Sequence, residues 1–189
     1  DTIQDAAATE RQLEREREMT RVCKDLAAAI AGVHGRVVQL CQPSQKRFHV
    51  ATNVALQRFL DAIIVNSSET AQRCVKYLKE RMLPPMTFLP LDDLRGPSLD
   101  PRLPELVNGR PALRLGMNCV CFDEQFSRAF EFLLGDVVFA DTMTDGRALA
   151  FGEVKNLGLS CKVVTLVGEA IAKNGNLSVD SGAAREGST

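Results

Sequence analysis

The chain has no tryptophan, a single tyrosine and two histidines among its 189 residues. The lack of tryptophan and the single tyrosine argue against a platform that stacks the bases of single-stranded nucleic acid. The sequence also lacks the GxxxxGK[ST] and GxGxxG patterns, so the common glycine-rich nucleotide-binding loops are absent. No apolar run reaches about 18 residues, which predicts no membrane-spanning helix. We therefore expect neither a membrane partner nor a small-molecule substrate.

The six cysteines are scattered through apolar segments, which favours a reducing, intracellular compartment. Cys119 and Cys121 form the one close pair, and no second pair or histidine follows at zinc-ligand spacing. We therefore expect no metal and no cofactor. One alternative is a small intracellular enzyme with Cys41 or Cys121 as nucleophile and His34 or His49 as base, although no activating motif surrounds these residues.

The formal net charge of −1 hides an uneven distribution. Residues 1–35 carry −2, residues 36–114 carry +5 and residues 115–189 carry −4. The middle segment places most of its cations on two predicted helices: Lys46, Arg47, Arg58, Arg73, Lys76, Lys79 and Arg81. These cations fit either solvated helix faces or a surface that contacts phosphates without reading base sequence.

Residues 6–31 contain no Gly or Pro and are rich in Ala, Leu, Glu and Arg, which predicts a helix. An apolar stripe in its second half fits two structures: an amphipathic helix packed on its own domain, or the stub of a coiled-coil arm. Further along, apolar runs predict strands at 35–41, 62–65, 87–91, 136–140 and 162–167. Capping and periodicity predict helices over 43–59, 66–82, 126–134 and 142–149.

Local signals add detail to these elements. Asn66, Ser67 and Ser68 supply N-cap side chains for the next helix, and Glu69 lies three residues after Asn66, as the acid of a capping box does. The helix that follows has an apolar face made of Ala71, Cys74, Val75, Leu78 and Met82. We expect Gly135 to end its helix with positive φ, Gly168 to turn a hairpin, and Pro90 to keep its strand at a sheet edge.

The segments starting at Asp61 and Asp136 resemble each other, because each places a short apolar strand before a capped helix and a second strand. The similarity predicts a duplicated strand–helix–strand unit with parallel pairing, although alternating elements also look alike by chance. We therefore predict an α+β fold with two mixed α/β lobes. Seven of the eight prolines lie in residues 84–111, which indicates an ordered connector between the two halves.

Four segments of the chain resemble the hinge domain of structural maintenance of chromosomes (SMC) proteins: residues 35–47, 61–65, 74–80 and 87–92. The run Leu-Cys-Gln-Pro-Ser-Gln-Lys at 40–46 is similar to the first SMC subunit of cohesin. The resemblance implies a coiled-coil arm stub and a hinge domain that forms half of a ring-shaped dimer. The implied boundaries are 1–31 for the stub, 32–182 for the hinge, with lobes at about 32–94 and 119–182 and a connector at about 95–118, and 183–189 for a tail.

The resemblance implies a dimerisation module without catalysis, since the family's ATPase head lies outside this chain. The implied partner is the hinge of the third SMC subunit of cohesin, with the pair closing a ring around DNA at chromosomes in the nucleus. The positions implied at the dimer contact are Phe88, Leu89, Val167, Gly175 and Leu177. The positions implied to contact DNA, weakly and without sequence preference, are Arg58, Lys173, Lys46 and Arg47.

The sequence departs from the family pattern at two places. After Lys173-Asn-Gly175 it has Val179 and Asp180 in place of the usual glycines, with Gly182 displaced. Gln57-Arg58 replaces the usual Gly-Lys, which keeps the charge but loses flexibility. An alternative retains the hinge fold but places it in another SMC complex, homodimeric or condensin-like.

Overall fold

The computed structural model describes residues 2–95 and 99–179. Contacts divide the described residues into two compact units. Unit 1 comprises those within Asp1–Gln39 and Asp61–Asp93, and unit 2 those within Leu40–Leu60 and Leu94–Thr189. The expected first lobe was therefore wrong in one respect, because residues 40–60 pack with the second unit. The expected tail at 183–189 lies outside the described residues, as do Asp180 and Gly182.

Unit 1 contains a three-stranded sheet in the order β1-β3-β4. Its strands are β1 (Val33–Arg36), β3 (Ile63–Val65) and β4 (Phe88–Pro90). Strand β3 pairs antiparallel with β1 and parallel with β4, where Ile64 lies opposite Leu89. Strand β4 is therefore an edge strand of this sheet, as the proline at position 90 predicts.

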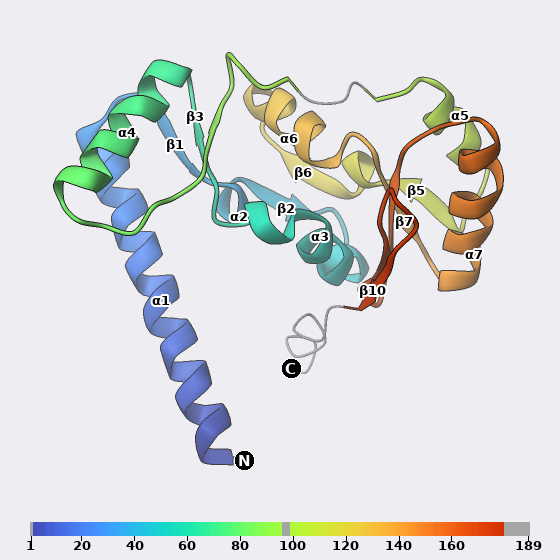
Figure 1. The fold of residues 1–189 in the computed structure, drawn as a ribbon, viewed down its shortest axis with the longest axis horizontal. Coiled ribbons are helices and arrows are strands. Elements are labelled where there is room, and N and C mark those ends of the chain that lie inside the picture. The colour runs from blue at the N-terminus through green and yellow to red at the C-terminus, as the bar shows by residue number, and fades with distance from the viewer. Residues whose placement is uncertain (1, 96–98, 180–189) are drawn as a thin grey trace. The chain divides into compact units, whose positions relative to one another are not determined.

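The long N-terminal helix α1 (Thr2–Ala29) belongs to unit 1 and is the blue helix in Figure 1. Only Val22, Cys23 and Leu26 are buried, all near its C-terminal end. Every residue from Thr2 to Glu18 is exposed. The apolar stripe thus docks the end of the helix on unit 1, while the charged part extends into solvent.

Arg36 on β1 ties α1 to the sheet, although it is only 2% exposed. Its guanidinium donates to Glu16 at 2.6 Å and to Thr20 at 3.0 Å, both on α1, and to Asp61 at 2.9 Å. We call these four residues the Arg36 clamp. The hydrogen bond and charge of Arg36 lower the pKa of Glu16, although partial burial acts in the opposite direction. Glu16 therefore stays ionised to a lower pH than a free glutamate does.

Helix α4 (Ser68–Glu80) connects β3 to β4. Its N-cap is Ser67, one of the three expected candidates, which accepts from the backbone N–H of Thr70, whereas the expected capping box of Asn66 and Glu69 was wrong. Glu69 instead pairs with Arg73 one turn along the helix. The buried face consists of Thr70, Cys74 and Leu78, whereas Val75 is 38% and Met82 93% exposed. The predicted apolar face is therefore only partly buried.

Unit 2 is built on a five-stranded sheet in the order β10-β9-β8-β7-β5. Its strands are β5 (Leu113–Leu115), β7 (Val137–Ala140), β8 (Lys162–Thr165), β9 (Glu169–Ile171) and β10 (Leu177–Val179). Strands β7 and β8 are parallel, and the remaining pairs are antiparallel. A separate antiparallel pair joins β2 (Cys41–Pro43) to β6 (Val120–Phe122).

The helices of unit 2 occur in the following order along the chain. They are α3 (His49–Leu56), α5 (Arg102–Val107), α6 (Ser127–Leu134) and α7 (Met143–Ala148), which continues as a π-helical segment, Leu149–Val154. Short 3-10 turns are η1 (Lys46–Phe48), η2 (Gln57–Phe59), η3 (Gly116–Cys119) and η4 (Glu124–Phe126). Because α5 and β5 lie within residues 95–118, the expected connector is largely part of unit 2.

Two local predictions were also wrong. The expected strand over 35–41 is divided by a single helical turn, α2 (Val37–Leu40). Gly135 follows α6 with φ −60, so this helix ends without the positive φ that was expected. The predicted hairpin is confirmed, since β8 and β9 pair across Gly168, whose φ is +94.

The duplicated unit is confirmed at the level of topology. In unit 1 the strands β3 and β4 are parallel and joined by α4, and in unit 2 the strands β7 and β8 are parallel and joined by α7. A helical crossover between parallel strands is the arrangement that the sequence predicted.

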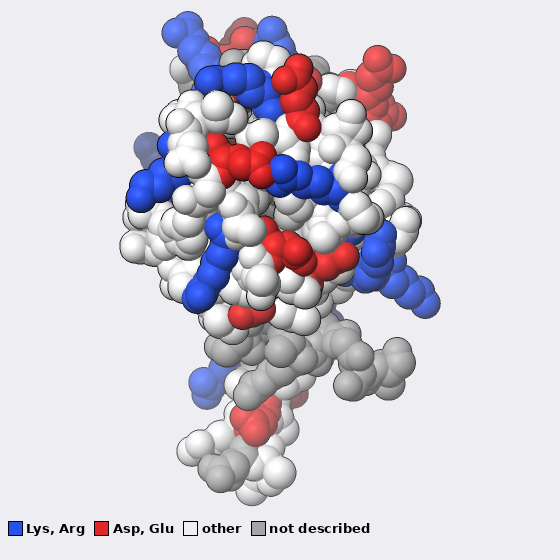
Figure 2. Space-filling view, turned by 90° about the vertical axis from the view of Figure 1, so that its right-hand side faces the viewer, with Lys and Arg blue, Asp and Glu red and all other residues white. Residues whose placement is uncertain are grey.

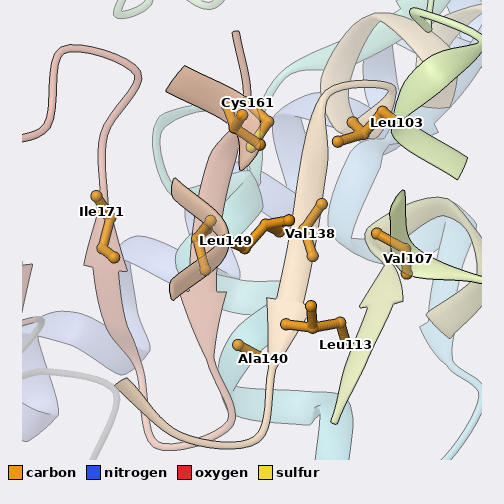
Figure 3. Close-up of a cluster of buried hydrophobic side chains, with 10 residues drawn as sticks. Leu103, Val107, Leu113, Val138, Ala140, Leu149, Cys161 and Ile171 are labelled. Atoms are coloured by element: carbon orange, nitrogen blue, oxygen red, sulfur yellow. The ribbon is translucent and has the colours of Figure 1, made fainter. Parts of the chain in front are cut away.

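One buried cluster of unit 2 lies between its sheet, α5 and the π-helical continuation of α7 (Figure 3). It brings together Leu103, Val107, Leu113, Val138, Ala140, Leu149, Val154, Cys161, Val163 and Ile171. Gly146 lets α7 approach β8 closely, because an added Cβ would lie 3.0 Å from Cγ1 of Val163. Among the described residues, no helix is long and apolar enough to cross a membrane.

Candidate functional site

Strand β4 is one of the two edge strands of the unit 1 sheet, with β1 at the other edge, and it carries two of the residues expected at a dimer contact. Leu89 is 4% exposed and packs inward, so only its backbone is available at the edge. Phe88 is half-buried and contacts the cluster of buried side chains in unit 1. An edge strand of this kind leaves backbone N–H and C=O groups available for another strand.

An apolar groove runs beside β4 in unit 1. It encloses about 490 Å³ and is lined by Ser68, Ala71, Gln72, Val75, Met86, Phe88 and Pro90. Phe88 therefore lies at the border between the sheet edge and this groove. Val75 is exposed because its side chain lines this groove from helix α4, while Phe88 and Pro90 line it from β4.

Strand β10 is one edge of the unit 2 sheet, with β5 at the other edge, and all three residues of β10 are exposed. Leu177 is 49% and Val179 71% exposed, although both are apolar. Val167, in the turn between β8 and β9, is 67% exposed. Apolar side chains exposed on an edge strand are typical of a surface that another chain covers.

Gly175 shapes the turn that leads into β10. Its φ of +86 is a conformation that other residues adopt only at a cost. An added Cβ would also lie 3.2 Å from the ring of Phe151. A glycine at this position therefore allows a close approach between the turn and the π-helical segment.

The four basic residues expected at DNA fall in two places within unit 2. Arg58 and Lys173 line one pocket of about 400 Å³, whereas Lys46 and Arg47 lie on η1 and are absent from its lining. The guanidinium of Arg47 lies 4.7 Å from the ring centre of Phe48 and its Nε donates to Gln45. The structure thus brings together two of the four residues.

Lys162 is a third cation of this pocket, and the sequence prediction missed it. It begins strand β8, opposite Val137, and its backbone N–H donates to the carbonyl of Asp136 at 2.9 Å. Burial lowers the pKa of Lys162; the charge of Asp136 acts against this, and those of Arg58 and Lys173 add to it. No sequence signal distinguishes this lysine from an ordinary solvated strand end.

Charged side chains of both signs are mixed on one face of the molecule and along helix α4. On the face drawn in Figure 2, Lys and Arg are interspersed with Asp and Glu, with no continuous basic surface. The basic helix α4 illustrates this, because Arg73 pairs with Glu69 and Lys76 with Glu80. These cations are thus better described as a solvated helix face.

The cysteines give little support to the alternative of a thiol enzyme. Burial raises the pKa of Cys41 to about 11, whereas a nucleophilic cysteine needs a lowered pKa. His34 bonds to the side chain of Asn66, and His49 to that of Asn53. Within residues 2–95 and 99–179 no group of His, Cys, Asp and Glu is arranged to hold a metal ion.

Comparisons with known proteins agree with this fold. The family model described as "SMC proteins Flexible Hinge Domain" matches residues 30–150. Structural maintenance of chromosomes protein 1 from Arabidopsis thaliana is 33% identical over 177 residues, which cover 94% of this chain and 14% of that protein. The protein of the same name from Caenorhabditis elegans is 33% identical over 186 residues, covering 96% and 14%. The chain thus spans about one seventh of the length of these relatives.

Solved structures show the same architecture. The Pyrococcus furiosus SMC protein hinge domain superposes with a TM-score of 0.70 and 26% identity, covering 94% of this chain and 89% of that one. A chain of the structure called "Folded elbow of cohesin" gives a TM-score of 0.75 and 26% identity, covering 94% and 25%. The fold is therefore an SMC hinge fold. The chain belongs to the family of SMC flexible hinge domains.

Proposed function

We propose that this chain is the dimerisation module of a cohesin-type SMC subunit, which pairs with the hinge of the third SMC subunit of cohesin. The observation that carries the proposal is the presence of two open sheet edges with apolar side chains, β4 in unit 1 and β10 in unit 2. The similarity to chains named structural maintenance of chromosomes protein 1 supports the choice of complex.

Pairing of edge strands explains how two hinges join. Strand β4 offers backbone groups and an adjacent apolar groove, and β10 offers backbone groups with exposed Leu177 and Val179. An added strand gains main-chain hydrogen bonds from the edge and specificity from side chains that enter pockets. We infer that β4 of one hinge pairs with the strand equivalent to β10 in the other, with apolar side chains entering the groove.

The departure at Val179 fits a heterodimer. Its side chain is 71% exposed on the edge strand, where the family pattern places glycine. A branched side chain here requires space on the partner, whereas glycine requires none. We infer that Val179 favours a partner with a matching recess over a second copy of this chain.

In the complete protein the pair closes a ring that surrounds DNA in sister chromatid cohesion, at chromosomes in the nucleus. The hinge itself is not an enzyme in this proposal, and ATP hydrolysis belongs to the head domain elsewhere in the protein. Arg58 and Lys173 provide weak DNA contacts through phosphates, supported by their position in one pocket. Lys46 and Arg47 contribute a second, separate contact.

The proposal is tested by mixing the chain with the third subunit's hinge and measuring the mass by light scattering. We expect a one-to-one complex at micromolar concentration and a monomer for this chain alone. A chain that forms a stable dimer by itself would instead support the homodimeric alternative. The proposal fails if no complex forms at micromolar concentration.

The DNA contact has its own test. The double substitution Arg58→Glu with Lys173→Glu should weaken binding to duplex DNA and reduce its salt dependence, because fewer counterions are released. Arg147→Glu with Lys155→Glu is the matched control, since both cations are exposed in unit 2 but lie outside this pocket. Equal salt slopes for the double variant and the parent would contradict a phosphate contact here, whether or not the hinges pair.

A further inference from the structure

The pocket that contains Arg58, Lys162 and Lys173 is formed entirely within unit 2. Arg58 comes from η2, Lys162 from the start of β8, and Lys173 from the turn after β9. Its remaining walls are supplied by α3, η2, α6 and the start of β7: Ala55, Leu56, Gln57, Phe59, Phe132, Leu133, Asp136 and Val137. Three cations from distant parts of the sequence thus converge on a recess of about 400 Å³.

The charge in this pocket is not balanced by its lining. Asp136 is the one carboxylate among the described residues that line it, and it forms an ion pair with Lys173. The carboxylate of Asp136 is 15% exposed and largely shielded from water, whereas the Lys173 side chain is 47% exposed. The pocket therefore retains about two positive charges in excess. The lowered pKa of Lys162 has the same origin, since burial and two neighbouring cations disfavour its protonated form.

The cations are held in place by the residues around them. The guanidinium of Arg58 lies 4.8 Å from the ring centre of Phe59, within the range of a cation–π contact. Phe59 packs edge-to-face on Phe132, with ring centres 6.0 Å apart. Lys173 is fixed by Asp136. Groups held in this way lose little conformational freedom when an anion arrives.

We propose that this pocket binds the terminal phosphoryl group of a phosphate monoester, with Arg58, Lys162 and Lys173 as its contacts and the Phe59–Phe132 pair beside its carrier. The ligand differs from the backbone phosphates of the DNA contact proposed above, although Arg58 and Lys173 serve both. The inference does not depend on pairing between hinges.

Charge decides between the two kinds of phosphate. A phosphate monoester carries about −1.5 to −2 at pH 7, whereas each backbone diester carries a single negative charge. Two excess positive charges match the monoester, and a diester leaves one of them uncompensated. Charge-assisted hydrogen bonds to a phosphate are about twice as strong as neutral ones, so the third cation favours the more highly charged group. A free ester and a 5′-phosphorylated DNA end both present this group.

The test measures binding of phenyl phosphate and of its methyl diester by titration calorimetry at low salt. We expect the monoester to bind at least tenfold more tightly than the diester. Lys162→Met removes the charge but keeps an apolar stem of similar length, and we expect it to weaken monoester binding about tenfold. Arg58→Gln should do the same, and Lys155→Gln should match the parent. Thermal unfolding of each variant establishes that the fold is retained.

Competition with duplex DNA distinguishes the two sources of the phosphoryl group. Displacement of phenyl phosphate by a 5′-phosphorylated duplex, but not by an unphosphorylated one, supports the pocket and assigns the group to DNA ends. Displacement by neither duplex supports the pocket and assigns the group to a free ester. Equal affinity for monoester and diester overturns the inference, whereas equal displacement by both duplexes supports the pocket and shows that backbone phosphates also reach it through Arg58 and Lys173. Unchanged binding in both Lys162→Met and Arg58→Gln also overturns it.

Discussion

The two strand–helix–strand units share a topology but differ in the strand that forms the edge of each sheet. In unit 1 the second strand, β4, is itself the edge, and its central residue Leu89 is 4% exposed. In unit 2 the second strand, β8, is covered by the hairpin of β9 and β10, and the edge moves to β10, where every residue is exposed. One edge is thus supported by its own core, while the other is apolar and uncovered. This asymmetry suits a contact between unlike edges.

The largest effect is expected at the supported edge. Phe88→Arg places a charge between β4 and the apolar groove, where pairing would bury it without a counter-ion. We expect the affinity for the partner hinge to fall by about 3 kcal/mol, which is more than a hundredfold in Kd. Titration calorimetry with the partner hinge measures this change.

Two controls separate pairing from folding. Phe88 also contacts the buried cluster of unit 1, so the thermal unfolding midpoint of the isolated variant must be measured as well. Met82→Arg adds the same charge at a side chain that is 93% exposed and outside the groove. Unchanged affinity for Phe88→Arg, or an equal loss for Met82→Arg, would remove Phe88 from the interface.

The Arg36 clamp lies within unit 1, so removing it tests whether unit 1 unfolds independently of unit 2. Arg36→Met removes a buried guanidinium that joins α1 to the sheet. We expect unit 1 to lose about 2 kcal/mol, less than for a fully buried pair, because Glu16 and Asp61 are half exposed and regain water. Hydrogen exchange should show faster opening in α1 and β1, with little change in β7 and β8.

Arg114→Met in unit 2 is the matched comparison. Arg114 is 16% exposed and has one carboxylate partner, Asp141, so we expect a loss of about 1 kcal/mol. An equal loss of protection in both units for Arg36→Met would show that the units do not unfold separately.

A substitution on the exposed edge strand β10 should have a smaller effect, and it should change the affinity for the partner hinge without changing stability. Leu177→Ser shortens an apolar side chain that is already 49% exposed, so the isolated chain should unfold at the same temperature as the parent. We expect affinity for the partner hinge to fall by about 1 kcal/mol, or roughly fivefold, from the apolar area no longer buried in the complex. A lowered unfolding temperature without a change in affinity would contradict this assignment of β10.

The smallest effect concerns pH. The pKa of Glu16 is lowered in the folded chain, chiefly by its hydrogen bond from Arg36, so its contribution to stability is present above the unfolded value and is lost as pH falls through the folded value. Glu16→Gln should therefore flatten the acid side of the stability curve of unit 1. Urea unfolding at neutral pH and at about pH 3 measures the slope. An identical slope in the variant would exclude Glu16 as its source.

The sequence predicted the repeated unit well because its signals are local. Apolar runs, helix caps and the proline at position 90 were enough to place β3, β4, β7 and β8 with their parallel pairing. The strand expected at 35–41 failed because Val-Val-Gln-Leu is equally compatible with one helical turn. Residues 40–60 were assigned to the wrong lobe because packing with distant segments has no local signature.

The candidate site was less predictable for the same reason. Leu89 was expected at the dimer contact, but its side chain faces the core, a distinction that requires the register of β4 against β3. Lys162 and Arg36 were missed, since a charged residue at a strand end normally indicates solvent. Arg36 is instead held inward by Glu16 and Asp61, and Lys162 lies near Asp136, all of them distant in the sequence.

The Arg36 clamp also fixes the direction of helix α1 relative to the sheet of unit 1. Glu16 lies 14 residues beyond Thr2 along α1, a length of roughly 21 Å of helix at about 1.5 Å per residue. The docked side chains Val22, Cys23 and Leu26 provide one point of attachment, and Glu16 provides a second point farther out. A rod attached at two points cannot swivel as one attached at a single point can. A rotation of about 10° about the inner point would displace the Thr2 end by roughly 5 Å. The clamp therefore holds α1 at a fixed angle to the sheet of unit 1, so a rotation of unit 1 would move the Thr2 end of the helix with it.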